Sequence, residues 1–206
     1  FITDDASRDD LVSLVYDITY GVVKPFTDTL VVLDDSIVRG TTLKQSILKI
    51  LDRLKPKKII VVSSAPQIRY PDCYGIDMAV FGKFIAFEAA VTLLKERGMQ
   101  SVIDKSYQEA KSQLLLPKEQ QQNVVKAIYE PFTADEISKK IAQLVRPSDL
   151  SCDLEIIYQS IEGLHQSCPD HLGDWYFTGN YPTAGGTRVA NKAFVHYVEG
   201  VQGRAY

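Results

Sequence analysis

Short apolar runs and amphipathic stretches alternate along the first half of this chain. Residues 30–33 form a Val-rich apolar run, and residues 58–64 form a second one. Such runs are typical of buried strands in a parallel sheet. Between them, residues 41–54 carry their apolar side chains along one helical face, with Pro56 just beyond the end. Strand, helix and strand within about 35 residues predict a right-handed βαβ unit.

The remaining pattern predicts mostly helices. Thr133 and Glu136 have the spacing of a capping box, as do Thr42 and Gln45 in the first predicted helix. Gly98 has the position of a residue that ends a helix. The predicted helices are residues 9–20, 81–97, much of 104–147, 154–165 and 187–198, and residues 175–186 are predicted to form an aromatic, Gly-rich loop.

These elements predict an α/β protein with a parallel sheet and added helices. We expect three segments: a sheet region in residues 1–103, a helical insertion in residues 104–150, and a helical C-terminal segment in residues 151–206. No internal repeat or low-complexity segment interrupts this order.

Composition narrows the class of protein. The net charge of −3 gives no basic footprint for nucleic acid. No apolar stretch reaches the roughly 20 residues that a membrane span needs, and residues 1–5 do not have the pattern of a signal peptide. Cys73, Cys152 and Cys168 form no C-x-x-C pair. We therefore expect a reduced, cytoplasmic protein without a nucleic-acid or membrane partner.

Candidate chemistry is concentrated where the first apolar run ends. Asp34 and Asp35 follow that run directly, and a loop with Gly40 leads into the predicted helix. The acids can accept hydrogen bonds from a ribose diol, and the amides at the helix start can hold a phosphate. A nucleotide hydrolase also uses such acids for Mg²⁺, but it needs a G-x-x-x-x-G-K-[ST] loop that this sequence lacks. An Asp at this place can also simply cap the next helix.

A second cluster is weaker. His165, Cys168 and His171 are spaced three residues apart, which suggests a metal site. Pro169 breaks the helix that would align them, and no fourth ligand is close in the sequence. We therefore do not favour a metal site at these residues.

Several segments resemble known proteins. Residues 31–42 resemble the phosphoribosyl pyrophosphate (PRPP) motif of type I phosphoribosyltransferases. Residues 64–71 and 74–77, and later 154–164 and 177–183, are similar to blocks of the glutamine amidophosphoribosyltransferase family, in the same order. The resemblance implies a type I phosphoribosyltransferase-like parallel sheet. It also implies the first step of de novo purine biosynthesis, in which ammonia from glutamine displaces pyrophosphate from PRPP to give phosphoribosylamine.

The resemblance assigns roles to individual positions. Asp34 and Asp35 are implied to be the catalytic acids, to bind the ribose hydroxyls and to lie near the Mg²⁺ that accompanies PRPP. The loop is implied to hold the 5′-phosphate, while a solvent-exposed or subunit-contacting role stays open for Arg39. The implied PRPP-binding residues are Asp34, Asp35, Ser36, Ile37, Val38, Arg39, Gly40, Thr41 and Thr42. The resemblance further implies purine nucleotides as inhibitors and a homo-oligomer.

The sequence also departs from the family. The N-terminal glutaminase domain and the pyrophosphate-binding strand are missing, so we expect weak PRPP binding and no turnover by this chain alone. Some members carry an iron–sulfur cluster on cysteines, but Asp72, Gly173 and Tyr176 stand at the corresponding positions, so we expect no cluster.

Two alternative functions stay open. One is a non-catalytic PRPP-sensing regulator, although no basic DNA-binding helix is visible. The other is a different type I phosphoribosyltransferase, such as one that acts on a nucleobase.

Overall fold

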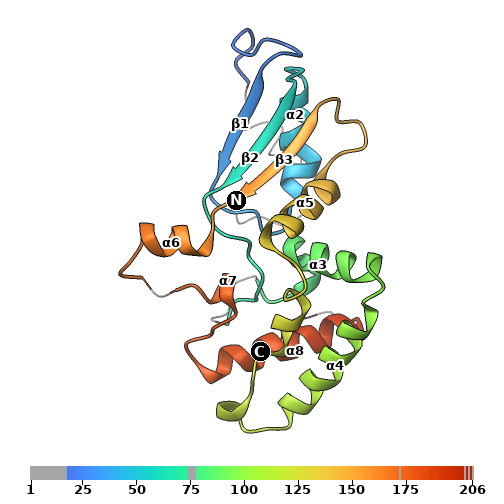
Figure 1. Ribbon diagram of the computed structural model, residues 1–206, viewed down its shortest axis with the longest axis vertical. Coiled ribbons are helices and arrows are strands. Elements are labelled where there is room, and N and C mark those ends of the chain that lie inside the picture. The colour runs from blue at the N-terminus through green and yellow to red at the C-terminus, as the bar shows by residue number, and fades with distance from the viewer. Residues whose placement is uncertain (1–17, 74–77, 172, 202, 204, 206) are drawn as a thin grey trace.

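The computed structural model describes residues 18–73, 78–171, 173–201, 203 and 205. It shows an α/β protein with a three-stranded sheet at one end and a helical layer at the other (Figure 1). The strands are β1 (Thr29–Asp34), β2 (Lys58–Ser63) and β3 (Asp153–Tyr158), in the order β1-β2-β3. Both pairings are parallel, so all three carboxyl ends lie at the same edge, as in a type I phosphoribosyltransferase-like sheet.

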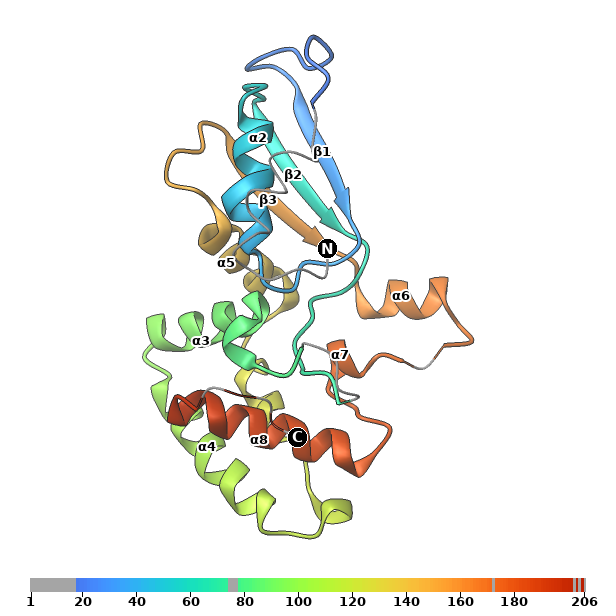
Figure 2. The same ribbon diagram turned by 180° about the vertical axis from the view of Figure 1, so that it is seen from behind.

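A helix covers one face of this sheet. It begins as a π-helical turn, η1 (Leu43–Ile47), and continues as α2 (Leu48–Asp52), which lies in front of the strands in Figure 2. Leu48 on this helix is completely buried, and Ile59 and Val61 of β2 face the same core. The hydrophobic effect of burying these side chains holds the helix on the sheet.

The opposite face of the sheet is open. Val31 and Leu33 of β1 are 61% and 73% exposed, and Ile157 of β3 is 44% exposed. The strand period of two residues places all three on this face, away from α2. The sequence analysis expected buried strands, so that expectation is wrong for this face of β1.

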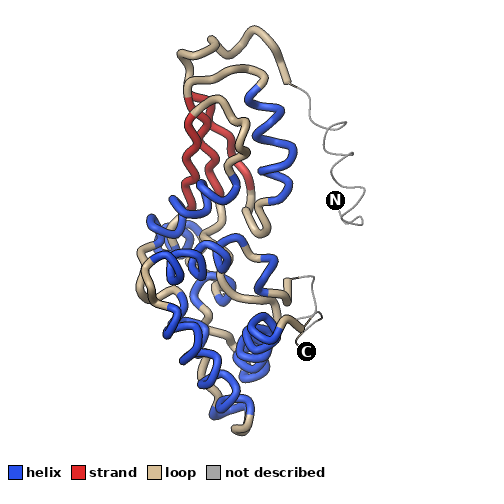
Figure 3. Tube along the Cα trace, turned by 90° about the vertical axis from the view of Figure 1, so that its right-hand side faces the viewer, coloured by secondary structure: helices blue, strands red, loops and turns tan. Residues whose placement is uncertain are grey.

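The helical layer has an aromatic core. Phe81, Phe84, Phe87 and Phe194 are almost completely buried, and the Phe81 and Phe87 ring centroids are 4.5 Å apart. Figure 3 shows this layer below the sheet, with the helices crossing one another. Its elements are η2 (Phe81–Lys83), α3 (Ile85–Glu96), α4 (Gln100–Leu114), η3 (Lys118–Gln120), η4 (Val124–Ile128), α5 (Ala134–Val145) and α8 (Ala184–Glu199).

Most predicted elements are present, and the capping box at the start of α5 is confirmed. The Thr133 hydroxyl accepts a hydrogen bond from the Glu136 amide, and the Glu136 carboxylate accepts one from the Thr133 amide. The predicted helix over residues 9–20 lies almost wholly outside the described residues.

The prediction of one helix over residues 154–165 is wrong. Its first half is β3, and α6 (Ile161–Ser167) begins only after Ser160, whose hydroxyl accepts a hydrogen bond from the Gly163 amide. Pairing with β2, which lies far away in the sequence, stabilises the strand, and short apolar runs are ambiguous without such a partner. The predicted loop over residues 175–186 contains α7 (Trp175–Thr178) and the first turn of α8.

Candidate functional site

The two acids lie at the carboxyl end of β1. Asp34 is the last residue of β1, and the segment after β2 holds this end of the strand in place. The Ser64 amide donates to the Asp34 carbonyl and the Ala65 amide donates to the Asp35 carbonyl, each at 2.9 Å. The acids therefore stand at the edge where ligands bind in parallel α/β sheets.

The local hydrogen bonds leave each carboxylate one oxygen for a ligand. Asp34 Oδ1 accepts from the Asp35 amide at 2.9 Å, and Asp35 Oδ1 accepts from the Ser36 amide at 2.6 Å. Within the described part of the chain, the second oxygen of each carboxylate has no hydrogen-bond donor. Partial burial raises the pKa of Asp34, the adjacent Asp35 carboxylate adds to the increase, and the hydrogen bond from the Asp35 amide opposes it.

The loop after the acids is anchored by its apolar residues. Ile37 is buried in the core, Val38 packs against that core, and the Val38 carbonyl accepts a hydrogen bond from the Ile85 amide at 2.8 Å. The Ile37 and Val38 side chains therefore have packing roles, which leaves only their backbone for ligand contacts. Ser36 and Arg39 are half-buried.

The structure explains why a glycine is required at position 40, which the sequence alone did not reveal. Its φ of +71° lies in the left-handed region, and a Cβ there would meet Val145 Cγ1 of α5 at 2.7 Å. The lack of a side chain at Gly40 thus allows α5 to pack closely against this loop.

The helix start has amides that precede its first helical hydrogen bond. The Lys44 amide donates to the Gly40 carbonyl at 2.9 Å, so the amides of Thr41 and Thr42 precede this helical hydrogen bond. Thr41 is exposed, and Thr42 makes no capping hydrogen bond with its side chain, so the predicted capping box at Thr42 and Gln45 is wrong. The Leu48 amide instead donates to the Leu43 carbonyl and closes a π turn, a feature frequent at functional sites.

The structure thus brings the acids, the loop and the helix start together at one end of β1. The carboxylates provide oxygen ligands of the kind that Mg²⁺ prefers. Among the described residues, no group of three or more His, Cys, Asp or Glu side chains is arranged to hold a metal ion. A magnesium ion here would need further oxygen ligands from a substrate or water. The convergence of residues 34–42 on one pentose phosphate stays a prediction.

Two other positions discussed in the sequence analysis, His165 and Asp72, make contacts between segments, whereas Cys168 is an exposed free cysteine. His165 Nε2 lies 3.1 Å from Asp174 Oδ2, which ties α6 to the segment before α7. Asp72 is completely buried, and its Oδ1 accepts a hydrogen bond of 2.7 Å from the Tyr176 hydroxyl. Asp72 and Tyr176, two of the three positions at which iron–sulfur members of the family are implied to carry cysteine ligands, are therefore joined by a hydrogen bond in this chain.

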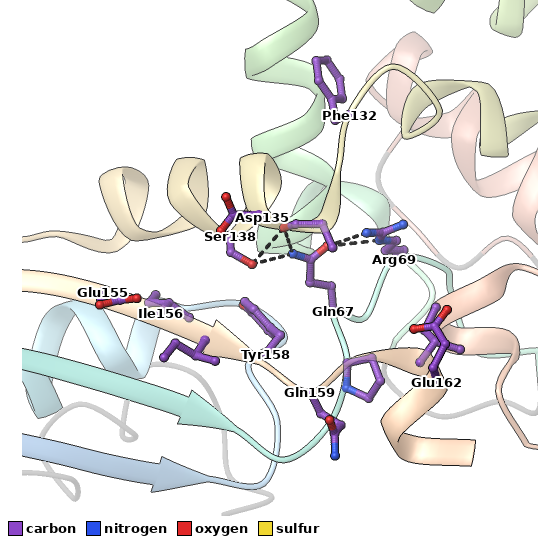
Figure 4. Close-up of a pocket in the computed structure, with 14 residues that line it drawn as sticks. Gln67, Arg69, Phe132, Asp135, Ser138, Glu155, Ile156, Tyr158, Gln159 and Glu162 are labelled. Carbon is purple, nitrogen blue, oxygen red and sulfur yellow. Dashed lines mark hydrogen bonds between the residues drawn. The ribbon is translucent and has the colours of Figure 1, made fainter. Parts of the chain in front are cut away.

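The sequence analysis missed a pocket at the end of β3. It measures about 390 Å³ and lies between the segment after β2, the start of α5, β3 and the start of α6 (Figure 4). Gln67 and Arg69 line it and hydrogen-bond to each other. Both residues lie within the block at residues 64–71 that resembles the family, but the sequence alone gave them no role, because the pocket forms only when α5 folds against the sheet.

Comparisons with known proteins agree with the resemblance over part of the chain. An amidophosphoribosyltransferase of Pasteurella multocida is 48% identical over 67 residues, which are 32% of this chain and 13% of that protein. The Escherichia coli amidophosphoribosyltransferase is 43% identical over 72 residues, which are 34% of this chain and 14% of that protein. The one from Pyrococcus horikoshii is 39% identical over 74 residues, 35% of this chain and 16% of that protein.

The matched segment thus spans about a seventh of the length of these curated relatives. No family model matches the chain. Within the described residues, no helix has both the length and the apolar character that crossing a membrane requires.

Proposed function

We propose that this chain, which carries a partial phosphoribosyltransferase region of the amidophosphoribosyltransferase type, is the PRPP-binding part of such an enzyme. The proposed reaction is the first step of de novo purine biosynthesis, in which ammonia derived from glutamine displaces pyrophosphate from PRPP. The single observation that carries the proposal is the placement of Asp34 and Asp35 at the carboxyl end of β1, directly before a loop and a helix start.

The chemistry of the reaction fits these groups. Carbon 1 of the ribose gains positive charge as pyrophosphate leaves, and nearby carboxylates stabilise such charge. Asp34 and Asp35 would bind the ribose hydroxyls through the oxygens that take no internal hydrogen bond. The same oxygens would hold Mg²⁺. A bound magnesium ion would neutralise the negative charge of the leaving pyrophosphate.

The loop and helix start would bind the 5′-phosphate. Ser36, Thr41 and Thr42 supply hydroxyls, and the helix dipole favours an anion at this end. Ile37, Val38, Arg39 and Gly40 would contribute backbone amides. Purine nucleotides share this phosphate chemistry, so inhibition by AMP or GMP would act through residues 36–42.

The open sheet face supports a larger assembly. Parallel sheets are normally covered on both faces, whereas Val31 and Leu33 remain exposed here. The proposed enzyme therefore includes further structure over this face, and the proposal includes a homo-oligomer with a cytoplasmic location. It includes no iron–sulfur cluster, because Asp72, Gly173 and Tyr176 stand where other members are implied to carry the cluster cysteines.

Affinity sets a limit on this chain alone. A helix N-terminus contributes at most about 2 kcal/mol to phosphate binding, whereas micromolar affinity requires about 8 kcal/mol. We therefore expect weak, Mg²⁺-dependent PRPP binding without turnover.

The test is an NMR titration of the chain with PRPP, with and without Mg²⁺. Amide shifts should be concentrated in residues 34–42, and the double variant Asp34→Asn/Asp35→Asn should remove their Mg²⁺ dependence. Ser160→Ala is a matched control, because it changes a capping residue outside the site. Shifts that avoid residues 34–42 would overturn the site, and tight binding by calorimetry would overturn the expected weakness.

A further inference from the structure

The pocket at the end of β3 lies apart from the proposed PRPP site on the same sheet edge. Its walls are Gln67 and Arg69 from the segment after β2, Ser138 of α5, and Tyr158 at the end of β3. Figure 4 shows these side chains on three sides of one hollow, with Glu162 of α6 at a further side. A volume of about 390 Å³ is within the range of small-molecule sites.

Arg69 is held in a fixed position within this pocket. Its Nε and Nη2 atoms donate to Gln67 Oε1 at 3.2 and 2.8 Å, and its guanidinium lies 5.4 Å from the ring centroid of Tyr129. The Arg69 backbone is also fixed, because its amide donates to the Tyr176 carbonyl and its carbonyl accepts from the Tyr129 hydroxyl. A guanidinium fixed in this way loses little entropy when it binds a ligand.

Gln67 is itself fixed by α5. It is 3% exposed, and its Nε2 donates to the Ala134 carbonyl at 2.7 Å and to Ser138 Oγ at 2.8 Å. Its amide orientation is therefore set, with Oε1 directed at Arg69. The Nε and Nη2 edge of the Arg69 guanidinium thus donates to the uncharged Gln67 side chain. The remaining nitrogen, Nη1, has no acceptor among the described residues.

The charges around the pocket favour a negative ligand at Arg69. Asp135 forms an ion pair with Lys139 at 2.6 Å, and Glu155 forms one with Lys58. Arg69 forms no ion pair with any described carboxylate. Glu162 is the third carboxylate that lines the pocket, and it has no ion pair among the described residues. It is exposed on α6, so water screens its negative charge.

Tyr158 contributes its ring to the pocket wall. Its hydroxyl is buried without a hydrogen-bond partner in the described part of the chain, so it does not face the open pocket. Burial raises the pKa of this hydroxyl, so the wall formed by Tyr158 carries no charge. The contact with an anion therefore rests on Arg69.

We propose that this pocket binds a small ligand through a carboxylate or phosphate group seated on the Nη1 side of Arg69. Arginine is the residue of choice for both groups, because its planar donors match their oxygens two at a time. The site is separate from residues 34–42 and does not depend on the proposed PRPP chemistry. The two sites are connected through the segment after β2, because Ser64 and Ala65 hold the carbonyls of Asp34 and Asp35 and the same segment continues to Gln67 and Arg69.

The experiment is an NMR titration of the whole chain with sodium phosphate in one arm and sodium acetate in the other. The Arg69 side-chain Nε resonance and the amides of Gln67 and Tyr158 should shift and saturate in at least one arm. The arm that saturates identifies the chemistry as phosphate or carboxylate. Shifts in residues 34–42 alone, or none at Arg69 in either arm, overturn the proposal and leave the PRPP site untouched.

Variants supply the controls. Arg69→Gln should weaken binding at the pocket about tenfold, the loss expected when a charged hydrogen bond is removed. Lys118→Gln makes the same change in net charge on an exposed helix outside the pocket and should change affinity less than about twofold. An equal loss in both variants would show that the anions respond only to net charge, and would overturn the site.

A third variant covers a loss of folding. Arg69→Gln also loses the contact with Tyr129, and the variant could unfold for that reason. In that case the Glu162→Gln variant tests the position of the anion. It removes an exposed negative charge from the pocket rim and should tighten anion binding about twofold. Unchanged or weaker binding in Glu162→Gln would contradict the proposed position of the anion.

Discussion

The helical layer buries Phe81, Phe84 and Phe87 almost completely, whereas the sheet leaves Val31 61% and Leu33 73% exposed on its open face. Both regions are rich in apolar residues, so composition alone does not distinguish them. The difference lies in the packing partners. The aromatic rings pack on one another across α3, η2 and α8, whereas none of the described elements packs comparably against the open face of β1. Apolar content therefore indicates where a core can form, and the number of packed sides decides whether it does.

The largest test of this comparison is truncation within the aromatic core. Phe87 is completely buried, with ring centroids of Phe81 at 4.5 Å and Tyr197 at 4.8 Å. Phe87→Ala should lower the free energy of unfolding by about 3–5 kcal/mol, because the cavity cannot be refilled. Leu33→Ala is the matched control and should cost less than about 1 kcal/mol. Urea denaturation measures both, and equal losses would show that the open face is packed after all.

The second test concerns the joint between the two regions. Gly40 and Gly98 both have positive φ, +71° and +68°, but a Cβ at Gly40 would meet Val145 Cγ1 at 2.7 Å, while one at Gly98 would meet nothing within 4 Å. Each Gly→Ala change should cost about 1–2 kcal/mol in backbone strain. Gly40→Ala should cost a further 1–3 kcal/mol or so from overpacking.

A rescue variant isolates the steric part of that cost. In denaturation experiments, Gly40→Ala combined with Val145→Ala should lose less stability than the two single changes added together. Strict additivity would mean that the loop after β1 does not depend on α5.

The third test uses pH to probe the surface of the helical layer. The Arg97 guanidinium and the Thr133 amide and hydroxyl lower the pKa of Glu136 to about 2, from its usual 4.5. Because the folded value is lower, Glu136 contributes stability above pH 4.5 and loses it as the pH falls towards 2. Stability of the Glu136→Gln variant should depend less on pH within that window. An NMR titration in which Glu136 has an ordinary pKa would contradict the Arg97 contact.

The smallest expected effect on stability belongs to the open sheet face. Leu33→Thr introduces a β-branched residue with a high strand propensity and should change the free energy of unfolding by less than about 0.5 kcal/mol. It should reduce self-association in sedimentation experiments, because it removes exposed apolar area. A large loss of stability together with unchanged association would show that this face is already covered.

Local signals predicted the elements whose stabilising contacts are close in the sequence. The cap at Thr133 and the helical pattern of residues 187–198 depend on neighbours within a few residues. The run at residues 30–33 pairs with β2, which lies far along the chain, but its continuous apolar, Val-rich character predicted a strand without that partner. The error at β3 has the opposite cause, since Leu154 and Ile156 are strand residues only because they pair beside β2.

The candidate sites differ in the same way. Asp34 ends β1 and Asp35 follows it directly, so a motif of a dozen residues predicted their place at the carboxyl end of the strand. Gln67 and Arg69 form a pocket only with Ser138 and Tyr158, which lie far along the chain. A spacing rule cannot detect such a site, because the distances are set by the packing of α5 against β3.

The connection after β2 has a consequence for protein engineering. Ser64 and Ala65 donate their amides to the carbonyls of Asp34 and Asp35, and the same connection then supplies Gln67 and Arg69. Adding or removing one residue between Ala65 and Gln67 would rotate the later side chains away from α5 while the earlier amides stayed in register. The length of this connection therefore constrains two sites at once. Substitutions can change the acids at the end of β1 or the pocket at the end of β3 separately, but an insertion or deletion in the connection would disturb the geometry of both sites.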